Sequence, residues 1–327
     1  CNVHQWPELP EKVALHLKLE YDTDMPKQFV EADVLSSEYD NNTKSRAIIP
    51  GRNMRYIVNA YPVLDNGKVS EICSNQFIFM RNTSEGYDCG YNIELPPGHY
   101  NIMVWSDLVN SNSTDNLYYN ADNFNEIYLT GEHAANTDYR DAFRGSNEQR
   151  LVADYRVQAP DTLTISMIRP LAKYEFITCD LSEFIEREAS IMAEKQSRDN
   201  STRVDINKYK VVFYYSGFMP NAFSIFTDKP VDSSTGVAFD SCLIPINENE
   251  ASMGFDYVFV NGKNSIITVR IAIYNEEGKQ ISITEPIDVP LKRSWHTIMR
   301  GDFLMSEASG GVYINPEFDG DYNFIIP

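Results

Sequence analysis

The chain has 327 residues, of which 43% are hydrophobic, and it carries a formal net charge of −19. Because single hydrophobic cores usually stop growing at about this length, two domains of about 150 residues each are expected. The 47 acidic residues outnumber the 28 basic ones, and no basic stripe is present to displace counterions from a phosphate backbone. This composition excludes nucleic acid as a partner. No apolar run approaches the roughly 20 residues of a membrane-spanning helix.

The first part of the chain is predicted to form strands. Apolar residues at every second position from Val13 to Tyr21 indicate a strand with one buried face. Residues 56–64 and 69–72 flank Asp65-Asn66-Gly67-Lys68. This tetrapeptide predicts a hairpin, because Asn and Gly both tolerate positive φ.

A long polar stretch follows a predicted central strand. The Pro96-Pro97-Gly98 turn leads into residues 100–105, which are apolar on both faces towards their end and favour a central strand with Trp105 as a core anchor. Residues 106–126 are rich in Asn, Asp and Ser and keep no apolar period, so they predict a loop. Three aromatic residues lie in this loop: Tyr118, Tyr119 and Phe124.

The domain boundary is predicted at residue 169. Strand periodicity restarts from Leu163 to Met167, and residues 169–176 continue it past Pro170, which central strands seldom hold. The expected division is a tether at 1–12, an N-terminal β-sandwich at 13–168 and a C-terminal β-sandwich at 169–327.

The C-terminal domain is predicted to begin with a short helix. Apolar residues recur at helical spacing from Leu181 to Met192, and Asp180 stands at the N-cap position. Residues 257–260 are then expected to pair with residues 266–274 across a turn at Asn261-Gly262. Further strands after that pair complete an antiparallel meander, which is typical of a sandwich.

The cysteines suggest an exported protein. A chain that begins at cysteine resembles a bacterial lipoprotein after signal-peptide cleavage by signal peptidase II, in which Cys1 carries diacylglycerol on its sulfur and an acyl group on its amine. The other cysteines fall two in each half, and disulfides between them are possible. Free buried thiols are favoured, because neither pair is dense enough for a disulfide framework. These residues are Cys73, Cys89, Cys179 and Cys242.

Patterns typical of enzymes and metal sites are missing from the sequence. It has no GxSxG elbow, P-loop or Rossmann fingerprint, and its five histidines lack metal-binding spacing. Asp22-Thr23-Asp24 and Asp319-Gly320-Asp321 are interpreted as solvated turns rather than calcium loops. No catalytic residue, cofactor or metal is expected, and a hydrolase is the weakest of the hypotheses.

Four parts of the sequence carry a resemblance to a known family. They are Leu95–Tyr100 with Val104–Asp107, Arg169–Lys173, Tyr215–Pro220, and Pro290–Arg293 with Gly301–Leu304. Together they resemble the fimbrillin-like proteins of Bacteroidia, close to the FimB-type fimbrial anchor lipoproteins and an uncharacterised relative family. The resemblance implies a mainly β fold of two tandem transthyretin-like, Greek-key β-sandwiches.

The resemblance also implies a function. A cell-envelope lipoprotein of this type is an anchor or accessory subunit in fimbrial assembly or cell adhesion, lipid-anchored in the outer membrane through Cys1 and exposed at the cell surface. Its partners are fimbrial subunits, bound by strand addition. Stalk subunits of the family are processed after an arginine, for which Arg46 is the candidate here, although an ordinary exposed arginine is the alternative.

Two further hypotheses concern particular residues. Arg169 and Lys173 are expected to pair with acids at the domain junction. The alternative function is a surface glycan-binding lipoprotein whose ligand loop contains Tyr118, Tyr119 and Phe124, because sugars stack on aromatic faces.

Overall fold

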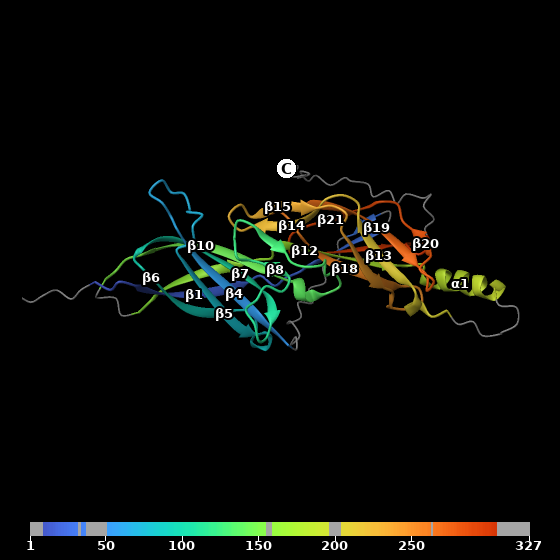
Figure 1. Cartoon of the computed structure of the whole chain (residues 1–327), viewed down its shortest axis with the longest axis horizontal. Coiled ribbons are helices and arrows are strands. Elements are labelled where there is room, and N and C mark those ends of the chain that lie inside the picture. The colour runs from blue at the N-terminus through green and yellow to red at the C-terminus, as the bar shows by residue number, and fades with distance from the viewer. Residues whose placement is uncertain are drawn as a thin grey trace, which may run out of the picture.

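The computed structural model describes residues 9–31, 34–36, 51–154, 159–195, 204–262 and 264–305. The molecule is elongated, with two β-sandwiches end to end and the helix α1 at the far end of the second (Figure 1). The predicted fold class, mainly β with tandem sandwiches and one helix, is confirmed. None of the helices in these ranges is long and apolar enough to cross a membrane.

The N-terminal sandwich packs a three-stranded sheet, of order β11-β1-β6, on a four-stranded sheet, of order β10-β7-β4-β5. β1 runs parallel to β11 and antiparallel to β6. Its predicted alternation is confirmed, because Leu15, Leu17 and Leu19 are fully buried. The bounds are β1 Val13–Tyr21, β4 Arg52–Pro62, β5 Asn75–Asn82, β6 Cys89–Leu95, β7 Gly98–Asn110, β10 Phe143–Leu151 and β11 Asp161–Met167, with a 3-10 turn at Thr83–Glu85.

The predicted turn lies between β4 and β5, but residues 69–72, predicted as the second strand, are not a strand; β5 begins at Asn75. The two strands pair antiparallel, and Val63 and Val69 form a bridge beside the turn. Gly67 has a φ of 78°, a conformation that a residue without a Cβ adopts freely, and its N–H donates to the carbonyl of Leu64.

β7 is the predicted central strand, lying between β10 and β4, and Trp105 in it is fully buried. The strand continues to Asn110, so the prediction of a loop from residue 106 is wrong for its first residues. Asp107 is buried there because Arg55 of β4 donates to both of its carboxylate oxygens, at 2.9 and 2.7 Å. Apolar periodicity does not reveal a buried charged residue whose charge is neutralised by a side chain of the neighbouring strand.

The C-terminal sandwich also has two sheets. One has the order β17-β18-β12-β22-β2-β3, and in the other β13 and β19 are central, with β16, β20 and β21 beside them. The bounds are β2 Lys27–Glu31, β3 Val34–Ser36, β12 Leu171–Thr178, β13 Lys210–Tyr215, β16 Ala238–Cys242, β17 Ile244–Pro245, β18 Ala251–Phe259, β19 Ser265–Tyr274, β20 Gln280–Ile283, β21 Ile287–Leu291 and β22 His296–Gly301, with a 3-10 turn at Ile206–Lys208.

The predicted pairing of residues 257–260 with 266–274 is wrong. β18 pairs with β12 and β17, whereas β19 pairs with β13, β20 and β21 in the opposite sheet. The chain therefore crosses from one sheet to the other after Val260, whose N–H donates to the carbonyl of Pro170. This crossing lets both strands turn an apolar face to the shared core, which the Asn-Gly signal alone does not reveal.

The predicted helix is confirmed as α1, Leu181–Lys195. Leu181 and Phe184 are buried against the C-terminal core. Asp180 stands at the predicted N-cap position, but its carboxylate accepts hydrogen bonds from the backbone N–H groups of Leu304 and Met305. The start of the helix is therefore tied to the last described residues.

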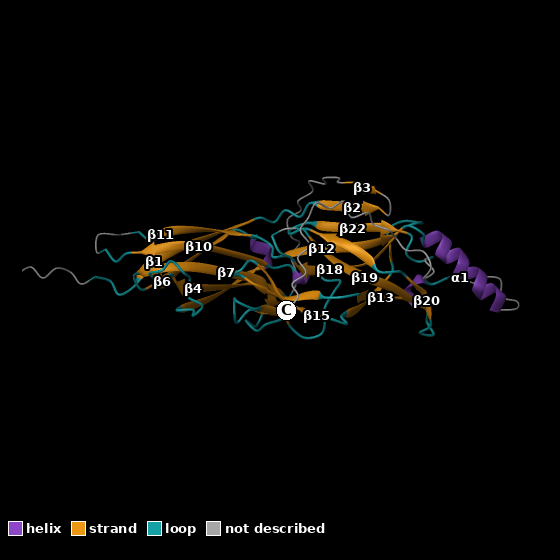
Figure 2. Ribbon diagram, turned by 90° about the horizontal axis from the view of Figure 1, so that it is seen from above, coloured by secondary structure: helices purple, strands orange, loops and turns teal. Residues whose placement is uncertain are grey.

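The chain passes between the two sandwiches more than once. β2 comes from the first 31 residues, yet it pairs in parallel with β22, as Figure 2 shows, and its Val30 enters the C-terminal core. A fifth sheet of order β15-β14-β9-β8 joins both halves. Its bounds are β8 Tyr119–Asn120, β9 Ile127–Leu129, β14 Met219–Ser224 and β15 Lys229–Ser234. The boundary at residue 169 stays a prediction.

Candidate functional site

The residues proposed from the sequence for ligand contact are separated in the structure. Tyr119 and Phe124 are fully buried, and the Tyr119 hydroxyl donates to the carbonyl of Arg140 at 2.6 Å. Tyr118 is half-buried. The three rings therefore do not form a joint stacking platform. Cys1 and Arg46 lie outside the described residues.

The junction between the sandwiches contains the predicted ion pairs. Arg169 donates through Nε and Nη2 to the two carboxylate oxygens of Asp141, at 2.8 and 3.0 Å, and both side chains are buried. Lys173 Nζ lies 2.9 Å from Asp138 Oδ1 in the short 3-10 helix η2, Asp138–Arg140. The prediction that Arg169 and Lys173 pair with acids is confirmed.

A second charged cluster surrounds Asp256 of β18. Its carboxylate pairs with the buried Arg140, lies 2.6 Å from His133 Nε2 and accepts a 2.6 Å hydrogen bond from the Tyr215 hydroxyl. Burial alone raises the pKa of the Asp256 carboxyl, but Arg140 and His133 outweigh burial and hold that pKa below its usual range. The loop that carries His133 is thereby fixed to the C-terminal sandwich.

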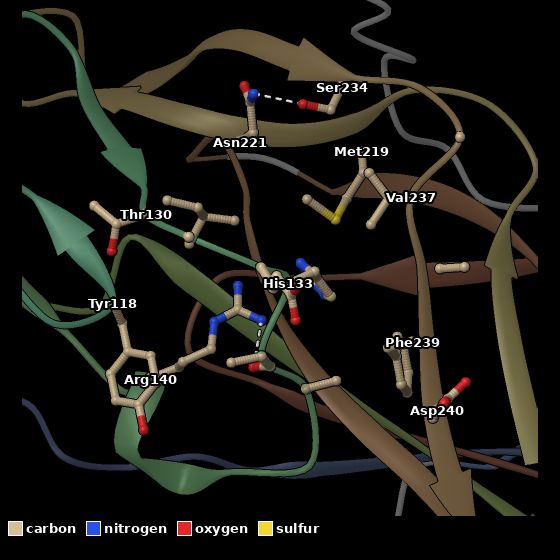
Figure 3. Close-up of a pocket in the computed structure, with 17 residues that line it drawn as sticks. Tyr118, Thr130, His133, Arg140, Met219, Asn221, Ser234, Val237, Phe239 and Asp240 are labelled. Carbon is tan, nitrogen blue, oxygen red and sulfur yellow. Dashed lines mark hydrogen bonds between the residues drawn. The ribbon is translucent and has the colours of Figure 1, made fainter.

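A pocket of about 750 Å³ opens above this cluster, and we call it the junction pocket (Figure 3). One side is formed by the fifth sheet, β15-β14-β9-β8, and the other by β16, with His133 and Arg140 between them. Of the three aromatic residues proposed from the sequence, Tyr118 alone lines it. The remaining lining residues come from segments far apart in the sequence: Leu129–Ala135, Arg140, Met219, Asn221, Ser234 and Gly236–Asp240.

The N-terminal sandwich is closed along one side. β10 and β11 belong to different sheets, yet Arg144 of β10 and Ile168, directly after β11, exchange two backbone hydrogen bonds of 2.9 Å. Gly145 permits this approach, because a Cβ there would lie 2.6 Å from the carbonyl oxygen of Ser166. Figure 2 shows the two strands side by side.

The other side of this sandwich is open in the described chain. β5 and β6 are the end strands of their sheets. Between them lies what we call the β5/β6 seam: Phe77 and Phe79 of β5 with Cys89 and Tyr91 of β6, all half-buried against the core. The Phe79 and Tyr91 rings stack with centroids 4.2 Å apart. Aromatic groups turned inward are thus incompletely covered.

The thiols and the candidate metal ligands are described for the residues that the structure covers. No group of three or more His, Cys, Asp or Glu side chains there is arranged to hold a metal ion. Cys73, Cys89, Cys179 and Cys242 are all free thiols, as the sequence favoured, but Cys242 is exposed and the others are half-buried. Burial raises the pKa of the Cys73, Cys89 and Cys179 thiols, which disfavours the reactive thiolate.

Sequence reasoning missed both the junction pocket and the β5/β6 seam. One usable signal was Asp256, an acid directly before the apolar residues of the strand predicted at 257–260, because a buried charge requires a partner. Its partners His133 and Arg140 are more than 110 positions away. The seam exists because β5 and β6 are the end strands of their sheets, and the sequence of a strand does not show whether the strand ends a sheet.

Comparisons with known proteins give a family and a set of similar folds. Residues 10–327 match the model of a family of unknown function, DUF6562. No curated protein matches the sequence significantly. A Bacteroides eggerthii structure described as a "putative cell adhesion protein" is 13% identical, with a TM-score of 0.44 and coverage of 94% of this chain and 91% of that one.

Two fimbrial proteins of Porphyromonas gingivalis are also similar. The fimbrial anchor protein Mfa2 is 11% identical, with a TM-score of 0.41 and coverage of 83% and 82% of the two chains. The C-terminally truncated tip fimbrial protein Mfa3 is 10% identical, with a TM-score of 0.38 and coverage of 85% and 81%. Such distant likeness does not transfer a function, because one fold serves many roles.

Proposed function

The chain belongs to the family of unknown function DUF6562, and we propose that it is a cell-envelope protein of fimbrillin type, an anchor or accessory subunit in fimbrial assembly or cell adhesion. In this proposal it binds fimbrial subunits by strand addition. The sequence resemblance supplies the class of function, and the β5/β6 seam supplies the acceptor site.

The seam is the observation that carries the proposal. An end strand presents a row of unpaired backbone N–H and C=O groups, which another extended segment can pair with. β5 and β6 both end their sheets on the side where Phe79 and Tyr91 are half-buried. A segment added there pairs its backbone with one strand and lays alternate apolar side chains over these rings.

Attachment to the membrane completes the proposal. The lipid expected on Cys1 holds the protein at the outer membrane, and Arg46 is not cut, because a cut after it would break the covalent link between the lipid and the chain from residue 47 onward. β1 lies on the lipid side of that cut and provides Leu15, Leu17 and Leu19 to the core. Mass spectrometry of the N-terminal peptide from the full-length protein tests both points.

Site-specific photocrosslinking tests the seam. Replacing Phe77 with the photoreactive residue p-benzoylphenylalanine, in full-length protein expressed in its native envelope, places a probe within the proposed acceptor site. Tyr128 of β9, which is 43% exposed and lies outside the seam, is the matched control position. Irradiation followed by mass spectrometry is expected to show Phe77-dependent cross-links to one envelope protein, at an extended segment with alternating apolar residues.

Two results overturn the proposal. One is a cross-link yield at Phe77 no higher than at Tyr128. The other is cross-linking at Phe77 to partners that contact it through helical or unrelated segments, since these would not add a strand.

A further inference from the structure

The junction pocket is large enough for a small ligand and separate from the β5/β6 seam. Its volume of about 750 Å³ falls within the usual range for ligand sites, roughly 300–1,000 Å³. No residue of β5 or β6 lines it. Tyr118 and Thr130 come from the first half of the chain, and Asn221, Ser234 and Phe239 come from the second (Figure 3). A bound ligand would therefore contact both halves.

Hydroxyl and amide groups line one side of the pocket. Asn221 Nδ2 donates to Ser234 Oγ at 2.6 Å, which leaves the Ser234 hydroxyl hydrogen free to donate. Asn221 Oδ1 is buried and has no donor among the described residues. Thr130 Oγ1 donates to the carbonyl of Leu117 and keeps its lone pairs as acceptors. Sugar hydroxyls both donate and accept, so they match this mixture.

The positive groups around the pocket are already paired. Arg140 and His133 share the Asp256 carboxylate, and Lys210 lies 2.6 Å from Asp240 at the rim. Glu132, also a lining residue, is exposed. An anionic ligand therefore meets no unpaired cation on the described lining and faces a chain of net charge −19. Phosphates and acidic sugars are disfavoured.

Aromatic rings supply apolar faces beside these polar groups. Tyr118 is half-buried on the lining. Phe239 is 6% exposed and is held in place by stacking on Phe213, with ring centroids 4.7 Å apart. A pyranose ring has hydroxyls at its edge and C–H groups on its faces, so it complements a pocket with a ring on one wall and hydroxyls on another. We infer that the junction pocket binds a neutral sugar residue of a glycan.

Saturation-transfer NMR on the full-length chain tests this inference. The probes are the methyl glycosides of glucose, galactose, mannose and N-acetylglucosamine, with N-acetylneuraminic acid as the anionic comparison and n-butylamine as the cationic one. Saturation is expected to reach at least one neutral glycoside and neither charged probe.

Two pocket variants and a control locate the binding. Tyr118→Ala and Asn221→Ala are each expected to weaken the affinity for that glycoside about tenfold, or about 1.4 kcal/mol. Tyr128→Ala removes a tyrosine of similar position in the sequence that does not line the pocket, and it should bind as the unsubstituted protein does. The thermal unfolding curve of each variant is compared with that of the unsubstituted protein to check that the variant is folded.

Three results overturn the inference: no transfer to any neutral glycoside, equal or greater transfer to a charged probe, or unchanged affinity in both folded pocket variants. If a pocket variant fails to fold, Glu132→Gln and Ser234→Ala replace it, and unchanged affinity in both of these has the same meaning. Cross-linking at Phe77 is independent of all these outcomes, so failure of the pocket and failure of the seam are distinguishable.

Discussion

The two sandwiches differ at their edges. In the C-terminal sandwich, β22 is followed by β2, a strand from the beginning of the chain, and Val30 of β2 is 2% exposed in the core. In the N-terminal sandwich, β5 and β6 end their sheets, and Phe79 and Tyr91 between them are half-buried. The part of the chain that the structure describes thus contains a filled edge and an open one.

The filled edge shows what an added strand contributes. β2 brings backbone pairs along β22 and an apolar side chain for the core, and the segment before it is fastened at two points. Arg169 Nη1 donates to the carbonyl of Asp24, and the N–H of His296 donates to the carbonyl of Pro26. The open edge offers the same kind of backbone groups, so a segment from another protein is the counterpart in the proposed function.

Breaking the Arg169–Asp141 pair should have one of the largest effects, because Arg169 also donates to the carbonyl of Asp24 in the segment before β2. Arg169→Met leaves a buried carboxylate unpaired, so the free energy of unfolding in urea should fall by about 3–5 kcal/mol. A double-mutant cycle with Asp141→Asn gives the coupling. For Lys173 and Asp138, the coupling should be about 1 kcal/mol or less, because the Asp138 side chain is 62% exposed. Equal coupling in the two pairs would contradict this difference.

The same substitution at the two edges should give different losses. Val30→Asp places a carboxylate in the C-terminal core and should lower the free energy of unfolding by about 3 kcal/mol or more, because the charge is desolvated or forced neutral. Ile78→Asp in β5, at a side chain that is 45% exposed, should change it by about 0.5 kcal/mol or less. Chemical denaturation compares them, and similar losses would show that the outer face of β5, on which Ile78 lies, is covered.

The seam aromatics should contribute less to stability than core aromatics. Phe79→Ala loses one stacked pair and part of a buried surface, so a fall of about 1–2 kcal/mol in the free energy of unfolding is expected. Phe176→Ala in the C-terminal core, where the ring is fully buried, should cost about 3–5 kcal/mol. Binding of a partner segment should make the loss for Phe79→Ala more similar to the loss for Phe176→Ala, because the segment would bury Phe79. If the difference between the two losses stays the same on binding, the partner does not contact the seam.

Mild acid should weaken the filled edge. Burial lowers the pKa of His296 in β22 below its ordinary value of 6.5. The nearby charges of Lys173 and Lys27 lower this pKa further, and Glu175 raises it by less than the other causes lower it. The folded state therefore favours neutral His296. Its stabilising contribution is fully present above pH 6.5 and is lost as pH falls through the lowered pKa. The free energy of unfolding should decline less steeply below pH 6.5 in His296→Gln than in the unsubstituted protein; parallel curves would exclude His296 as the cause.

The sequence by itself determined the local elements. Alternation from Val13 to Tyr21, the Asn66-Gly67 turn and the helical spacing after Asp180 all correspond to observed elements, because each depends on neighbours within a few residues. The paired charges at Arg169 and Lys173 were also predictable, since buried cations require acids.

Tertiary structure alone decided which elements meet. Periodicity shows that a strand has a buried face but not which strand lies beside it, so the separation of β18 from β19 and the placement of β2 beside β22 could not be predicted. For the same reason, Tyr118 was the single pocket residue proposed in advance, and Tyr119 and Phe124 beside it are buried. Both candidate sites exist because distant segments end at the same edge or meet at the same junction, and that outcome depends on long-range packing.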